Sequence, residues 1–280
     1  MLQTYALLGS NDVSKQALFS ICISASAIAF TSTSISVDFD TDPQQRSNAP
    51  AFYGYTPSKH RTRLFFIMMF ISASHALMKV LACSLMMRLN QTWLWTYLLG
   101  DMCLFFLFKF IRGELRYFLP LDGVVGLVAT TVIRIVVKTV NDFVLVVQFR
   151  HPMEMSGMYW TLSFIMNQVF CFISVYLYGK LFPGVNDGMI EMLWLITISL
   201  FFFSILSSVV FLLLINHEFW PTFFSVQTGK QYVVYNYENA TTDALKFQVF
   251  IYHRMYYDDI QEEIMKWYVF EKNIFQPVSI

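Results

Sequence analysis

Six ionisable side chains lie inside segments that are otherwise apolar, and through them this sequence could do chemistry. A charged side chain at the centre of a bilayer costs roughly 2.5–3.5 kcal/mol even on insertion scales. We therefore expect these groups to face one another or water, as an intramembrane polar network. Its members are His75, Lys79, Asp101, Arg134, Lys138 and Asp142.

Helical spacing predicts which members share a face. His75 and Lys79 are four residues apart, and Arg134, Lys138 and Asp142 follow one another at the same interval. Side chains at this spacing lie on one side of an α-helix. Each apolar segment with more than one ionisable residue should therefore present them as a single polar stripe.

Predicted depth in the bilayer suggests partners across helices. Asp101 and Arg134 both fall near the middle of their segments, so we expect them to pair. Asp142 should pair with Lys79 or Lys138. With the histidine neutral, the network carries a surplus positive charge, which suits an anionic passenger. Two alternatives stay open: the network only fixes the register of the helices, or the histidine relays protons.

The composition places the chain in a membrane. Of its 280 residues, 56% are hydrophobic and 14% are charged, whereas a soluble domain carries roughly 25% charged residues. The mean hydropathy is +0.51. Basic and acidic residues balance at 19 each, so nothing indicates a nucleic-acid partner. We expect an integral membrane protein whose main partner is the lipid bilayer.

Apolar runs of this length predict an all-α fold, a polytopic bundle of about six transmembrane helices in residues 16–216, after an N-terminal tail at 1–15. The fourth run differs from the others, because its three charged residues mean that it cannot face lipid on all sides. The predicted spans are 16–37, 64–87, 93–111, 121–147, 158–178 and 190–215.

The tail at 217–280 is polar in character and is predicted to lie outside the membrane. Within it, residues 243–267 have the pattern of an amphipathic helix with an apolar stripe and an acidic polar face. The acidic face argues against binding to an anionic membrane surface. We expect this helix to lie on the membrane, to dock under the bundle, or to bind a partner protein.

Six crossings would place both ends of the chain on one side of the membrane. The basic residues near the membrane then favour a topology in which both ends are non-cytoplasmic. Two glycosylation sequons, at Asn90 and Asn239, fall on that same side. The predicted orientation inverts if the fourth run does not span.

Three aspartates just after the first run are the candidate metal ligands. Asp38, Asp40 and Asp42 match the opening of a calcium loop, but a proline and an alanine then stand where glycine and glutamate belong. The alternative is an acidic loop that pairs with Arg46 or with the basic residues at 59–63. No catalytic or cofactor motif occurs, so we predict no cofactor and no catalytic residue, and an enzyme acting on lipid ranks third among the functions.

Three stretches resemble recurring motifs of an uncharacterised family of multi-pass membrane proteins from microbial eukaryotes. They are Val37 to Pro57, Tyr97 to Gly123 and Ile133 to Trp160. The resemblance covers most of the chain up to about Gly229. It supports the multi-pass topology, but the family has no established activity, so it assigns no role to any residue.

Two functions are consistent with these patterns. The first is a transporter, channel or lipid-translocating protein, which passes an ion, a small anion or a lipid headgroup along the polar face of the second, third and fourth runs. The alternative is a non-transporting scaffold or accessory subunit of a membrane complex, with the 243–267 helix as its docking element.

Overall fold

The computed structural model describes residues 2–8, 15–112, 123–182 and 186–227. The predicted tail helix at 243–267 and the sequon at Asn239 lie outside these residues. Within them the secondary structure is helical, with no strand. The predicted all-α fold is therefore confirmed.

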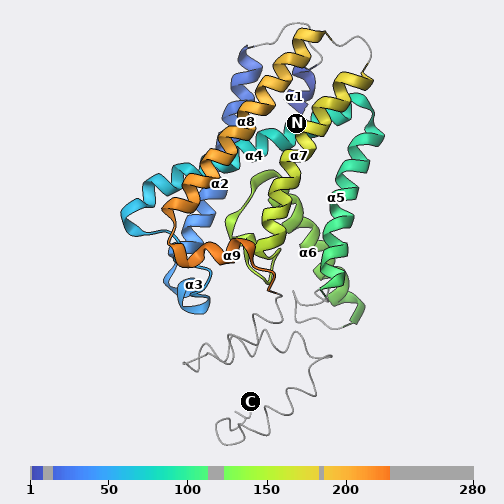
Figure 1. Ribbon diagram of the computed structural model, residues 1–280. Helices are drawn as coiled ribbons and strands as arrows, with labels where there is room; N and C mark the ends of the chain where they lie inside the picture. The colour runs from blue at the N-terminus through green and yellow to red at the C-terminus, as the bar shows by residue number, and fades with distance from the viewer. Residues whose placement is uncertain (1, 9–14, 113–122, 183–185, 228–280) are drawn as a thin grey trace, which may run out of the picture.

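Six helices are long and apolar enough to cross a membrane, and they form a bundle (Figure 1). The chain is therefore an integral membrane protein, as its composition predicted. The six helices are α2 (Lys15–Thr41), α4 (Arg61–Leu89), α5 (Gln91–Ile111), α6 (Gly123–Val144), α7 (Gly157–Leu181) and α8 (Asp187–Leu214). Shorter elements are α1 (Leu2–Leu7), α3 (Pro43–Asn48), α9 (Trp220–Phe224) and the 3₁₀ turns Ser58–His60, Val147–Arg150 and His217–Phe219.

Helix α4 is the centre of the bundle and packs against all five other long helices. Its residues between Ser72 and Met86 are buried on most sides, whereas α8 exposes phenylalanines and leucines over much of its length. Because lipid tails are as apolar as leucine, exposed apolar side chains are what a membrane-facing helix requires. The polar side chains are accordingly turned inward.

Contacts between helix termini define two ends of the bundle. At the end that we call the basic end, Asn216 after α8 donates its backbone N–H to the Tyr55 carbonyl after α2, over 3.2 Å. Arg112 after α5 donates to the Ser156 hydroxyl before α7, over 2.5 Å. At the opposite end, Arg88 of α4 donates to the carbonyl of Tyr5 in α1, over 3.0 Å.

Helix α6 differs from the other five in where it stops. Its last carbonyl, of Val144, accepts hydrogen bonds from Ser32 of α2 over 2.9 Å and from Ser72 of α4 over 2.5 Å. Both serines lie well inside their helices. Leu145 then takes the left-handed conformation, with φ of 50°, and the chain turns back toward the basic end (Figure 1).

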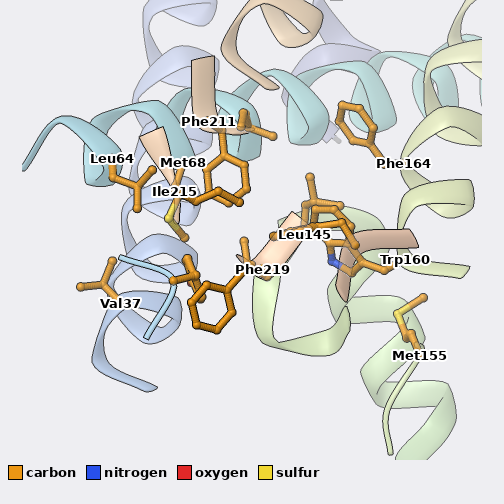
Figure 2. Packing of buried hydrophobic residues seen from close by; sticks show 14 of the residues in the cluster. Val37, Leu64, Met68, Leu145, Met155, Trp160, Phe164, Phe211, Ile215 and Phe219 are labelled. Atoms are coloured by element: carbon orange, nitrogen blue, oxygen red, sulfur yellow. The ribbon is translucent and has the colours of Figure 1, made fainter. Parts of the chain in front are cut away.

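The turn after α6 is covered by a hydrophobic core cluster. Figure 2 shows Leu145 together with Trp160, Phe211 and Phe219, which come from α7, α8 and the turn after α8. Leu145 is 3% exposed. A leucine with positive φ costs about 1–2 kcal/mol, and the packing of its side chain in this cluster offsets that cost.

The backbone at the start of α7 lies directly against the segment that follows α8. A Cβ atom added at Gly157 would stand 1.8 Å from the carbonyl oxygen of Thr222, and the Met158 N–H donates to the Ser225 carbonyl over 3.0 Å. A side chain at position 157 would therefore force the two segments apart.

We predict that Gly157→Ala lowers the stability of the protein, because the new Cβ overlaps the Thr222 carbonyl. The expected loss is about 1–3 kcal/mol or more, as for other overpacked sites. The measurement is thermal unfolding in detergent. Gly100→Ala is the matched control, since a Cβ there meets nothing within 4 Å and alanine is the better helix former. Equal melting temperatures for the two variants would contradict the close approach.

Candidate functional site: an ion cluster among α4, α5 and α6

Helices α5 and α6 each turn one polar stripe into the bundle. The stripe of α5 consists of buried residues four apart: Tyr97, Asp101, Phe105 and Lys109. The stripe of α6 has the same spacing: Thr130, Arg134, Lys138 and Asp142. The opposite side of α6 exposes valines such as Val124, Val128 and Val136. Helix α6 is thus amphipathic, with its charges inside.

Two lysines and two aspartates form the centre of the site. Lys138 Nζ lies 2.8 Å from Asp101 Oδ2 and also pairs with Asp142 Oδ1. Lys79 Nζ lies 3.5 Å from Asp101 Oδ2 and 4.0 Å from Asp142 Oδ2. Both lysines are at most 1% exposed. Charges of opposite sign therefore balance within one cluster, and Asp142 pairs with both of the lysines that its predicted depth gave as alternatives.

A second layer of hydrogen bonds orients this cluster. His75 Nε2 lies 3.0 Å from the Asp142 carbonyl oxygen, and Asn167 Nδ2 lies 3.2 Å from His75 Nδ1. A carbonyl only accepts and an amide NH₂ only donates, so these contacts fit a neutral imidazole protonated at Nε2. Ser163 donates to Asp142 Oδ1 over 3.3 Å, and the Lys79 ammonium lies 4.4 Å from the centre of the Tyr97 ring.

Arg134 takes a different place from the one that its predicted depth indicated. We expected it to pair with Asp101, whose partners in the structure are Lys138 and Lys79. Arg134 is buried one turn nearer the start of α6, and its positive charge acts on the carboxyl group of Glu154. The six predicted site residues therefore divide into a central cluster with His75 and an outer position at Arg134.

Glu154 and Lys109 belong to the site although the sequence did not single them out for it. Lys109 Nζ donates to the Glu154 backbone carbonyl over 2.5 Å. Burial raises the pKa of the Glu154 carboxyl to about 7, against the opposing effects of Lys109 and Arg134. Glu154 lies between two apolar runs, where no periodicity relates it to a helix face, so no sequence signal could have placed it beside α6.

Several buried polar atoms of α6 and α7 lack a hydrogen-bond partner within the described residues. They are the hydroxyl oxygens of Thr130 and Tyr159 and both amide atoms of Asn141. Asn141 and Thr130 are fully buried. Thr130 and Asn141 belong to α6 and Tyr159 to α7, and an unsatisfied buried polar group costs about 1–3 kcal/mol.

A hollow lies at the basic end, beside the end of α5 and the start of α7. It measures about 220 Å³ and is lined by Phe108, Arg112, Met158, Tyr159 and Val226. The Tyr159 ring contacts the rings of Phe105 and Phe108, each at 5.3 Å between centroids. Phe105 is one turn from Asp101 on α5. Aromatic side chains thus lie between the lining of the hollow and the ion cluster.

The three aspartates proposed as metal ligands differ in their surroundings. Asp40 is buried and accepts from the backbone N–H groups of Gly54, Tyr55 and Thr56 over 2.6, 3.0 and 2.9 Å. Asp42 caps α3 through the Gln44 N–H, and Asp38 is exposed. No three His, Cys, Asp or Glu residues of the described part are grouped to hold a metal ion.

Asp40 instead holds the loop that follows α2, with Arg46 as its neighbour. Asp38 and Asp40 lie in the last turn of α2 rather than in the expected loop. The Arg46 Nε donates to the Asp40 carbonyl over 2.6 Å, so the expected contact between these aspartates and Arg46 is present. The carboxylate replaces three backbone partners that the loop cannot supply for itself. Within the D-x-D pattern, Asp40 therefore fixes the loop after α2 through hydrogen bonds to its backbone.

Compared with protein-family models, with curated proteins and with solved structures, the chain matches none of them. The fold and the site define it as a multi-pass membrane helix bundle with charged residues buried among α4, α5 and α6.

Lys138 is the residue on which the charge balance of the cluster depends. Lys138→Met should destabilise the protein by about 3–5 kcal/mol, because it leaves two buried carboxylates with Lys79 alone. Thermal unfolding in detergent measures the effect. Lys180→Met is the control, since this lysine is exposed and surface substitutions usually change stability by about 0.5 kcal/mol or less. Similar losses for both variants would contradict the pairing.

Glu154 should make the stability depend on pH. Its pKa is about 7 in the folded protein, against an ordinary value of 4.5, so between these values the folded state holds more protons than the unfolded state. Stability should therefore fall as pH rises from about 4.5 to about 7, on the order of 2–3 kcal/mol. Glu154→Gln should flatten this part of the curve. An unchanged slope of melting temperature against pH in that variant would refute the assignment.

Proposed function

We propose that this protein passes a small anion, or the anionic headgroup of a lipid, along the face between α4, α5 and α6. The cations on this face follow one another from the basic end inward, and all but the half-buried Arg112 are buried. Arg112 stands at the hollow, Lys109 and Arg134 lie near the end of α5, and Lys138 and Lys79 lie at the middle. Cations in series attract an anion into a low-dielectric interior that would otherwise exclude it.

The observation that carries the proposal is the presence of unsatisfied polar atoms beside these cations. Thr130, Asn141 and Tyr159 offer donors and acceptors without a partner in the described residues. A bundle held only for stability would gain by replacing them with apolar side chains. Such buried polar atoms are expected where a passenger loses its water and forms hydrogen bonds with the protein instead.

The proposal requires that the described conformation is a closed one. Asp101 and Asp142 neutralise both central lysines, and Phe105 contacts Tyr159, which lines the hollow. An anion would advance by displacing one carboxylate from a lysine. The end of α6 beside the cluster supports such a step, because transporter binding sites commonly use helices that break at the middle of the membrane.

A scaffold or accessory role is the second candidate, and one observation favours it. The two lysines and two aspartates are already paired with each other. Such a balanced cluster can fix the register of three helices without any passage. The two functions predict different outcomes for flux when a charge pair is removed and the fold is kept.

The test is reconstitution into liposomes, with flux of chloride or phosphate and scrambling of a fluorescent anionic lipid as separate readouts. The variant is Lys79→Gln with Asp101→Asn, which removes one charge of each sign and leaves Lys138 paired with Asp142. Lys180→Gln is the control at an exposed lysine. We expect the double variant to lower the rate about tenfold, equivalent to ~1.4 kcal/mol in the barrier.

Two outcomes would contradict the proposed path. If the folded wild-type protein moves neither anion nor lipid, the proposal fails. If wild type and double variant move them equally, the path does not use this cluster. A double variant that unfolds at a lower temperature, in a protein without flux, would support the scaffold role.

A further inference from the structure

We infer that α6 enters and leaves the bilayer through the same face, so that the chain crosses five times between α2 and α8. The start of α2 and the end of α8 then lie on opposite sides of the membrane. This topology holds whether or not the protein transports anything. It concerns which side each loop faces, and it replaces the sequence-based expectation of a topology with both ends on one side.

The contact between Arg112 and Ser156 carries the argument. Arg112 directly follows α5, and Ser156 directly precedes α7, with α6 between them in the chain. The guanidinium and the hydroxyl are 2.5 Å apart. The hydrocarbon core of a bilayer is about 30 Å thick. If α6 crossed it completely, these two residues would lie on opposite sides.

The direction of α6 agrees with this contact. Arg134 acts on Glu154, whose carbonyl accepts from Lys109 at the end of α5. One turn later Lys138 reaches Asp101 at the middle of α5. The last carbonyl, of Val144, then lies against serines inside α2 and α4. The helix thus runs from the basic end to the middle of the bundle and ends there.

The segment after α6 returns to the basic end, as the hydrogen bonds of Val147 and Arg150 show. The Val147 N–H donates to the Ser36 hydroxyl over 3.3 Å, one turn beyond Ser32 on α2. Arg150 then donates to the Phe52 carbonyl and to Thr222, over 3.1 Å for the latter. Both partners belong to segments that follow the ends of α2 and α8. The chain is therefore back at the basic end before α7 begins.

Non-helical backbone at this depth is possible because protein groups satisfy it. The Val144 and Asp142 carbonyls accept from serines and from His75, and the Val146 carbonyl accepts from Trp160 Nε1 over 3.0 Å. Irregular backbone inside a bilayer is tolerated only when it is buried in protein or lines water. The turn at Leu145 meets that condition.

The new topology keeps the charge asymmetry between the two faces. Arg150 and Lys180 exchange sides relative to the six-crossing topology, so the number of described basic residues at each end stays the same. Basic residues of the described chain at the basic end are Arg46, Lys59, Arg61, Arg63, Lys109, Arg112 and Arg150, and those at the opposite end are Lys15, Arg88 and Lys180. The positive-inside rule assigns the basic end to the cytoplasm, with the sequon at Asn90 on the other side.

Four exposed positions distinguish the topologies by single-cysteine labelling. Two lie at the basic end, Lys59 and Glu218, and two at the opposite end, Gln91 and Asp187. Each is changed to cysteine in the full chain after Cys22→Ala and Cys103→Ala remove the exposed native thiols, while the buried Cys83 and Cys171 are kept. A membrane-impermeant maleimide is applied to sealed vesicles, and again after permeabilisation.

Five crossings predict that Lys59→Cys and Glu218→Cys are labelled from one side, and that Gln91→Cys and Asp187→Cys are labelled from the other. Six crossings exchange the second member of each pair, so that Asp187→Cys joins Lys59→Cys and Glu218→Cys joins Gln91→Cys. The exchanged pattern, or any other grouping, would overturn the inference. Elution of each variant like the wild type shows that the fold is kept.

Discussion

The structure depends on the need to satisfy polar backbone groups where lipid supplies no hydrogen bond. Helix α6 ends inside the bundle, and an α-helix leaves its last four carbonyls without intrahelical partners. Side chains of other helices fill this need: Ser32 and Ser72 at Val144 and His75 at Asp142. Trp160 does the same for the Val146 carbonyl in the turn that follows. These partners fix how α2, α4 and α7 can lie around α6.

The same requirement governs the charges. A lysine brought into a low-dielectric interior needs an opposite charge at close range, and α6 carries both Lys138 and Asp142 four residues apart. Asp101 from α5 and Lys79 from α4 complete the balance. Each helix therefore brings a charge that the others neutralise. The cluster links α4, α5 and α6 at the depth where α6 stops, so the helix end and the ion pairs support each other.

The basic end is held by a second set of polar contacts between segments far apart in the chain. Arg150 lies against the Tyr55 and Phe223 rings, at 4.7 and 4.8 Å from their centres, and burial lowers the pKa of its guanidinium. Asp40 holds the loop that carries Tyr55. Gly157 lets the start of α7 approach Thr222. Together these contacts bring the segments after α2, α6 and α8 to one place.

The sequence by itself determined that the chain is an all-α membrane bundle, because hydrophobic length is a local property that each run carries alone. It also determined that the charges of α6 point inward, since spacing by four residues puts them on one face. Tertiary structure decided which charges meet. Asp101 pairs with Lys138 rather than the expected Arg134, because pairing depends on where α6 stops. That point is set by serines on α2 and α4 that no local pattern distinguishes from other small residues. The place of Glu154 beside α6, and the return of the chain at Leu145, result from the same long-range contacts.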